Sequence, residues 1–124
     1  EKIHGMIIEA EEIGGFKVLS KIIEVDSAET LRKISKNLEE HMRSGIAWLA
    51  TSILGKSTLI CVVSQDLIQK GIKANEMVNS VALLADGKGG GKTNIAQAGI
   101  KSPEKLQGAL SAAADIFREK IQIN

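Results

Sequence analysis

Apolar residues recur along the chain at two different spacings, which predicts that strands and helices alternate. Runs rich in β-branched and apolar residues are typical of strands. Four strands are expected at Met6–Ile13, Phe16–Val25, Ile46–Leu54 and Thr58–Ser64, and a fifth, short and rich in small residues, at Ile95–Ile100. Gly14 and Gly15 join the first two runs and suit the positive φ angles of a hairpin turn. The stretch Leu59–Val63 is apolar at every position, as in a central strand that is covered on both faces.

Helical spacing separates these strands. Asp26 and Glu29 have the spacing of a capping box and should start a helix, and Gly45 stands where a left-handed C-cap would end it. The core stripe of this helix is Ala28, Leu31, Ile34, Leu38 and Met42. A turn is expected at Gly55, Lys56 and Ser57, and a short helix at Asp66–Lys70.

Two further helices complete the pattern. The first carries Met77, Val78, Val81, Ala82 and Ala85 on its core face. The second opens with Ser102 as N-cap and Pro103 at the first helical position, and its core face is Leu106, Ala109, Leu110, Ala113, Phe117 and Ile121. The chain is therefore expected to be α/β, with α+β as the alternative. We expect a mixed sheet of about five strands, flanked by helices near residues 27–43, 74–85 and 103–120.

Length and charge narrow the picture. A chain of 124 residues fits a single domain, and a start at Glu1 without Met suggests a fragment of a longer protein or a processed chain. No apolar run reaches the ~20 residues of a membrane-spanning helix. The net charge of +1 means that any binding to nucleic acid must come from a local patch. Lys33 and Lys36, on the outer face of the helix after Asp26, are candidates to widen such a patch.

The most informative segment is glycine-rich. Four of the five residues from Gly87 to Gly91 are glycine, with Lys88 among them and Lys92 directly after them. Glycine lets the main chain approach a partner closely, and successive N–H groups of a loop can form a nest for a phosphate oxygen. A flexible surface turn is the alternative. A nucleotide-binding P-loop is excluded, because that motif needs glycine where Asp86 stands.

Catalytic patterns are not found in the sequence. His4 and His41 have no metal-ligand spacing with a carboxylate or with Cys61. Cys61, on an apolar strand, is expected to be a core residue with an unreactive thiol, and Trp48 is expected to pack in the core. We therefore predict no catalytic residue and no metal ligand in this chain.

The glycine segment and its surroundings resemble a known family. A run of glycines and a basic residue, followed by Ala-Gln-Ala and Gly, is similar to the DHHA1 domain at the C-terminus of alanyl-tRNA synthetases. Here the motif reads Gly89–Lys92, Ala96–Ala98 and Gly99, and the agreement continues through Ser102–Leu106. The DHH-type phosphodiesterase branch resembles Gly-Gly-Gly-His instead, and Lys92 stands in place of that His. The segment Lys92–Asn94 and Ile100 depart from the synthetase pattern.

The resemblance implies a function. Residues 1–124 would be one DHHA1-like, C-terminal RNA-binding domain of a cytoplasmic alanine–tRNA ligase, contacting the outer corner of tRNA and helping to connect aminoacylation with editing. The ligase would use ATP, Mg and zinc in its other domains, and this domain would need no cofactor. Partners would be tRNA and those domains. One alternative is a mainly structural or dimerisation module, in which case the chain could form a homodimer. The other is the DHHA1 domain of a DHH-type phosphodiesterase. The expected RNA contacts are Lys88, Gly89, Gly90, Gly91, Lys92, Gln97 and Lys101.

Overall fold

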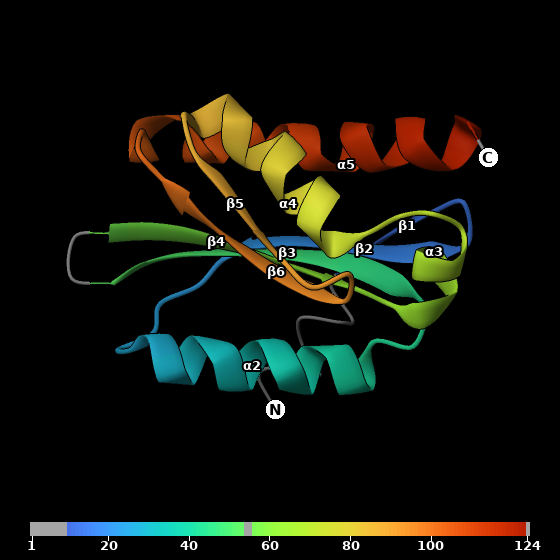
Figure 1. Ribbon diagram of the computed structural model, residues 1–124, viewed down its shortest axis with the longest axis horizontal. Coiled ribbons are helices and arrows are strands. Elements are labelled where there is room, and N and C mark those ends of the chain that lie inside the picture. Colours follow the sequence, from blue (N-terminus) through green and yellow to red (C-terminus); the bar gives the residue numbers. More distant parts are fainter. Residues whose placement is uncertain (1–9, 54–55, 124) are drawn as a thin grey trace.

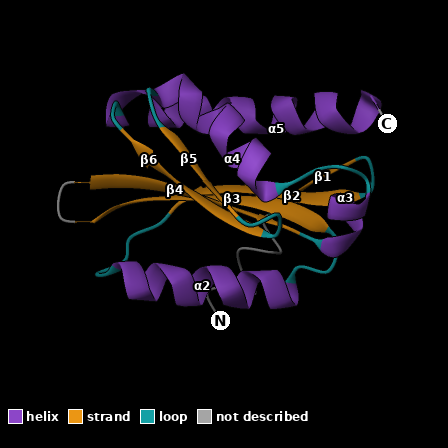
Figure 2. Ribbon diagram, viewed as in Figure 1, coloured by secondary structure: helices purple, strands orange, loops and turns teal. Residues whose placement is uncertain are grey.

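The computed structural model describes residues 10–53 and 56–123, and these form three layers (Figures 1 and 2). The strands are β1 (Glu11–Ile13), β2 (Phe16–Ile22), β3 (Gly45–Ile53), β4 (Lys56–Val63), β5 (Lys88–Gly91) and β6 (Ile95–Ile100). The helices are α2 (Ala28–His41), α3 (Gln65–Gln69), α4 (Ala74–Ala82) and α5 (Leu106–Ile123), and the 3₁₀ turns are η1 (Leu83–Ala85) and η2 (Pro103–Lys105). This confirms the predicted mixed α/β fold.

The six described strands form one sheet in the order β1-β2-β3-β4-β6-β5. Among these strands only β2 and β3 run parallel, joined by the crossover through α2, and every other neighbouring pair is antiparallel. β4 lies between β3 and β6 and is buried along most of its length, as its apolar sequence predicts. None of the described helices combines the length and hydropathy that a membrane-spanning segment requires.

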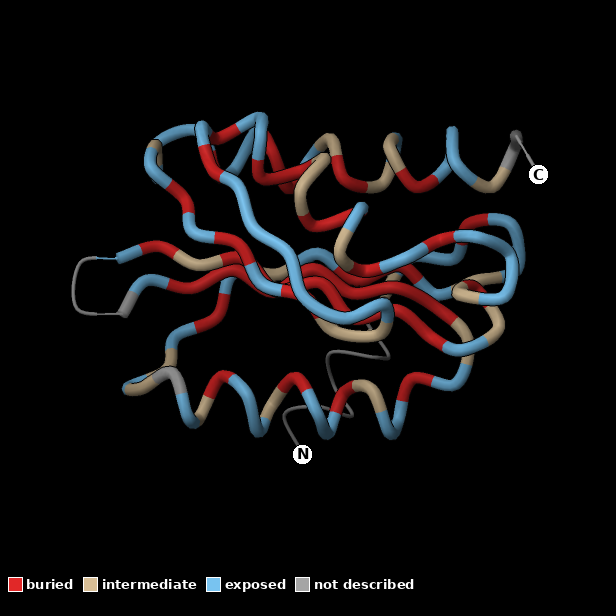
Figure 3. Tube along the Cα trace, viewed as in Figure 1, coloured by how far each residue is buried: buried red, intermediate tan, exposed pale blue. Residues whose placement is uncertain are grey.

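Each face of the sheet packs against different helices. α4 and α5 cover one face, over a core that includes Trp48 and Phe117, both of which are completely buried. The ring of Phe117 meets the ring of Phe16 edge-on, with 6.1 Å between centroids. α2 covers the other face, and its buried residues, which include Leu31 and Leu38, pack against the sheet. Figure 3 shows that the buried positions of this helix face the strands. On this face, Gln97 and Gly99 of β6 are exposed and are not covered by any helix of the described part of the chain.

The hairpin turn lies where the sequence predicts it, but three predicted helix caps are wrong. Gly14 and Gly15 have φ angles of 60° and 88°; the predicted strand residues 6–9 lie outside the described part of the chain. α2 is capped by Ser27, whose hydroxyl accepts from the Thr30 N–H at 3.2 Å, and not by Asp26. Gly45 begins β3 and has no positive φ; a Cβ there would lie 2.3 Å from the Lys17 carbonyl oxygen. Ser102 makes no side-chain cap.

Two of the three residues predicted to form a turn at 55–57 lie in a strand instead. Lys56 and Ser57 already belong to β4 and pair with Ile53 and Ser52 of β3. Pairing with β3 satisfies the backbone of these two residues, which a turn would expose. Residues 54 and 55 lie outside the described part of the chain.

The glycine segment is a strand and not a loop. Lys88–Gly91 forms β5 at the edge of the sheet and pairs antiparallel with β6, with Gly90 opposite Gln97. Glycine has little preference for strands, so the pairing with β6 determines the extended conformation. This strand raises the number from the expected five to six.

Candidate nucleic-acid interface

Among residues 10–53 and 56–123, the β5–β6 pair has one open face. Ala96, Ala98 and Ile100 point toward the core under α4 and α5 and are buried, while Gln97 and Gly99 between them are exposed. Successive side chains of a strand point to opposite faces. Gly90, opposite Gln97, and Lys88, opposite Gly99, therefore lie on the uncovered face of the sheet, the face that α2 covers elsewhere.

The glycines of β5 serve two different purposes. A Cβ on Gly89 would lie 2.2 Å from the Gln97 carbonyl oxygen, and one on Gly91, where φ is 148°, would lie 2.9 Å from the Ala96 Cα. These two positions need glycine because β6 is too close. A Cβ on Gly90 would meet nothing within 4 Å. No contact of the described fold therefore requires glycine at position 90, and its lack of a side chain keeps the open face flat.

A phosphate-binding nest of successive N–H groups is not formed by β5. The N–H groups of an extended strand alternate in direction, and a nest needs them to converge. The Gly89 N–H points away from β6 and donates to Asn79 Oδ1 of α4 at 3.3 Å. This bond caps part of the exposed edge of the sheet, and no local sequence pattern indicates it.

α2 and the glycine strand line one concavity, which we call the α2 cleft, with a volume of about 380 Å³. Its lining is Arg32, Ser35, Lys36 and Glu39 of α2, Ile60 of β4, Gly90 and Gly91 of β5, and Lys92, Asn94, Ile95, Ala96 and Gln97. The lining holds three cationic side chains and one carboxylate. A surface with this balance attracts anions.

The turn that carries Lys92 is fixed on three sides. The Ala74 N–H of α4 donates to the Thr93 carbonyl at 2.8 Å, and the Val63 N–H of β4 donates to the Asn94 carbonyl at 2.9 Å. The Asn94 side-chain amide donates to Glu39 Oε2 of α2 at 2.5 Å. The carboxylate in the cleft is thus engaged by an amide, and the turn places Lys92 on a rigid support.

The structure does not bring all seven predicted RNA contacts together. Gly90, Gly91, Lys92 and Gln97 line the α2 cleft. Lys88 is at the other end of β5, about 13 Å along the strand from Lys92, and Lys101 follows β6 at that same end. Gly89 lies on the core side of the strand.

Asp86 neutralises part of the end that holds Lys88 and Lys101. It has a left-handed backbone, with φ of 57°. Its carboxylate accepts from the Ser102 hydroxyl at 2.5 Å and from Lys105 Nζ at 3.0 Å. These two partners hold the pKa of Asp86 below its ordinary value. The Ser102 hydroxyl that was expected to cap a helix therefore binds Asp86.

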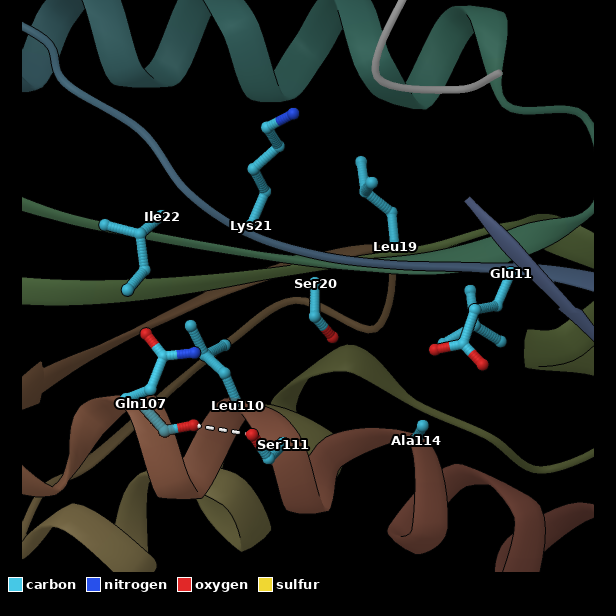
Figure 4. A pocket seen from close by; sticks show the side chains of 10 residues that line it. Glu11, Leu19, Ser20, Lys21, Ile22, Gln107, Leu110, Ser111 and Ala114 are labelled. Atoms are coloured by element: carbon cyan, nitrogen blue, oxygen red, sulfur yellow. Dashed lines mark hydrogen bonds between the residues drawn. The ribbon is translucent and has the colours of Figure 1, made fainter. Parts of the chain in front are cut away.

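A second cavity of about 410 Å³ lies between β2 and α5 (Figure 4). Ser20 of β2 faces Gln107, Leu110 and Ser111 of α5 across it. The Ser111 hydroxyl is already bonded to the Gln107 carbonyl, at 3.0 Å. The lining holds a single acidic and a single basic residue, so this cavity lacks the charge excess of the α2 cleft.

Trp48 and the histidines were also singled out from the sequence. Trp48 is completely buried, as predicted. His41 lies on α2 and its Nδ1 is 2.7 Å from the Asn37 carbonyl oxygen; His4 lies outside the described residues. Within the described part of the chain, no three His, Cys, Asp or Glu residues group in a way that could hold a metal ion.

The Cys61 thiol should be unreactive toward alkylating agents in the folded protein. It is completely buried on β4, and burial raises the pKa of its thiol well above the ordinary value. The thiolate that reacts with alkylating agents is therefore scarce at neutral pH. We expect iodoacetamide to leave the native chain unmodified and to alkylate it once in denaturant, as measured by intact mass. Rapid labelling of the native chain would contradict this burial.

Sequence comparison places the chain among known proteins. The model of the family described as the DHHA1 domain matches residues 15–119. An alanine–tRNA ligase of Shewanella amazonensis is 42% identical over 113 residues, which cover 91% of this chain and 13% of that protein. An alanine–tRNA ligase of Natranaerobius thermophilus is 30% identical over 120 residues, covering 97% of this chain and 14% of that protein. The chain thus spans about one seventh of these relatives.

Solved structures agree with the sequence comparison. The C-Ala domain of Aquifex aeolicus alanyl-tRNA synthetase superposes with a TM-score of 0.77 at 25% identity, covering 89% of this chain and 98% of that one. A DHH domain from a protein described as a member of a ribosomal protein family has a TM-score of 0.63 at 14% identity, over 94% of this chain and 30% of that one. The second likeness shows the fold alone.

Proposed function

Because the chain belongs to the DHHA1 family, as the C-terminal domain of an alanyl-tRNA synthetase, we propose that it binds tRNA. The domain would contact the outer corner of the folded tRNA and help connect aminoacylation with editing in the parent ligase. Both reactions would take place in other domains, where ATP, Mg and zinc would act. The chain itself would contribute no catalytic residue and no cofactor, and its setting would be cytoplasmic.

The α2 cleft is the observation that supports this proposal. Three cations surround a wall of β5 that has no side chain at Gly90, so a phosphodiester backbone can approach the main chain. The described residues offer no aromatic side chain in this cleft for base stacking. Recognition would therefore depend on shape and backbone contacts, which suits a folded RNA.

Binding should depend steeply on salt. Each neutralised phosphate contributes about −0.7 to −0.9 to the slope of log K against log salt, so three cations predict a slope between about −2 and −3. Raising the salt from about 50 to about 200 mM should then weaken tRNA binding roughly 20- to 40-fold. Titration of the 124-residue chain with labelled tRNA at both ionic strengths checks this. Binding that ignores salt would contradict contact through the backbone.

A structural role is the second candidate, and exposed apolar side chains favour it. Leu83 and Leu84 of η1 are 60% and 48% exposed, and Ile22 on β2 is 49% exposed. Such side chains are suited to packing against another domain or a second copy. A chain that forms a dimer in sedimentation experiments but binds no tRNA would favour this function.

A further inference from the structure

We infer that α2 supplies the second half of the RNA site, with Arg32 and Lys36 holding phosphates of the same RNA that crosses β5. This inference rests on the proposed function and adds a helix far from the glycine motif in sequence. It starts from the shape of the α2 cleft, in which α2 forms one wall and the β5–β6 turn forms the other.

Position on the helix selects Arg32 and Lys36 among the basic residues of α2. Residues four apart lie on the same helix face, and both side chains line the cleft. Lys33 is the next residue but projects elsewhere. Its Nζ lies 3.8 Å from Glu29 Oε1, and its side chain is 74% exposed outside the cleft. The three basic residues of this helix are therefore not equivalent.

The opposite wall is suited to the same ligand. Lys92 lies on the fixed turn, and Gly90 leaves the strand open to close approach. A phosphodiester between the walls would have a guanidinium and an ammonium group on one side and a second ammonium on the other. Arg and Lys are the side chains that bind phosphate oxygens most strongly in proteins. The cleft is thus fitted to the backbone of one RNA strand.

Glu39 gives the inference a test of opposite sign. Its carboxylate lies in the cleft, and Oε2 accepts from the Asn94 amide. Glu39→Gln keeps an oxygen acceptor for Asn94 and removes one negative charge. If RNA phosphates enter the cleft, this variant should bind tRNA about two- to threefold more tightly. An unchanged or weaker affinity would place the RNA backbone outside the cleft.

The decisive comparison uses the 124-residue chain, an unmodified tRNA transcript and one matched control. Arg32→Gln with Lys36→Gln should weaken binding about fivefold and reduce the steepness of the salt dependence by about 1.5. The control Lys33→Gln removes an equal type of charge from the same helix and should change affinity by less than about twofold. Glutamine favours helix, so all variants should melt like the unaltered chain.

The outcomes separate this inference from the proposed function. If the Arg32 and Lys36 pair has no effect while Lys92→Ala weakens binding, the helix wall is not a contact and the proposed function stands. If Lys33→Gln weakens binding by about twofold or more, the loss reflects the general charge of the helix and the inference fails. If the unaltered chain binds tRNA and no variant of either wall weakens that binding, the inference fails because the RNA lies outside the α2 cleft. If the unaltered chain binds no tRNA, the proposed function fails. Loss from the pair alone, with Lys33→Gln silent, supports the second wall.

Discussion

Gly89→Ala should destabilise the domain by about 3 kcal/mol or more, whereas Gly90→Ala, one residue later, should not. The added Cβ of the first variant would lie 2.2 Å from the Gln97 carbonyl oxygen and 2.4 Å from the Ala98 Cα, which are main-chain atoms of β6 that cannot move aside. The strands must then separate or the sheet must shift. Chemical unfolding followed by circular dichroism measures the difference between the two variants.

Gly90→Ala is the matched control for this prediction. A Cβ at Gly90 meets nothing within 4 Å, and alanine costs less backbone entropy than glycine on folding. Its free energy of unfolding should be unchanged or higher by up to about 1 kcal/mol. Equal stability of the two alanine variants would show that β5 does not lie against β6 as described.

The strand and helix content could be predicted because it depends on local pattern. The short segment of small residues between Ile95 and Ile100 forms β6 at the predicted bounds, and the apolar run in β4 marks the buried centre of the sheet. The core face of α5 follows from the spacing of residues such as Leu106 and Phe117, both buried. In these segments propensity, periodicity and tertiary packing agree.

The glycine strand could not be predicted, because its conformation is imposed from outside. A run of glycines has no side-chain pattern and little strand propensity, so β5 exists only because β6 pairs with it. The predictions of the helix caps were wrong for a related reason. Both Asp26 and Ser27 have capping side chains, and the backbone geometry at Ser27 decides between them. Ser102 bonds instead to Asp86, which is 16 residues earlier.

The sequence draws attention to the glycine segment and Lys92, but it does not indicate the shape of the α2 cleft that they line. Its second wall comes from α2, and the contact that fixes the walls joins Glu39 to Asn94 across 55 residues. Nothing local in either residue indicates that contact. The sequence likewise grouped Lys88 and Lys101 with Lys92. In the fold, Lys88 and Lys101 lie near one end of β5, and Lys92 follows its other end.

Gly90→Val should weaken tRNA binding about tenfold, equivalent to about 1.4 kcal/mol, while the fold is retained. The valine side chain would project from the wall of the α2 cleft into the space where the RNA backbone is proposed to lie. Valine is well suited to a strand, so stability should not fall. Lys92→Ala, which removes one charge, should weaken binding about threefold.

Parallel measurement of tRNA affinity and thermal melting for Gly90→Val tests the central claim most directly. The expected result is an unaltered melting temperature together with a dissociation constant about ten times higher. If Gly90→Val melts early, this glycine serves the fold and the structural role gains support. If the variant melts normally and binds tRNA like the unaltered chain, the open face of the glycine strand is not where RNA lies.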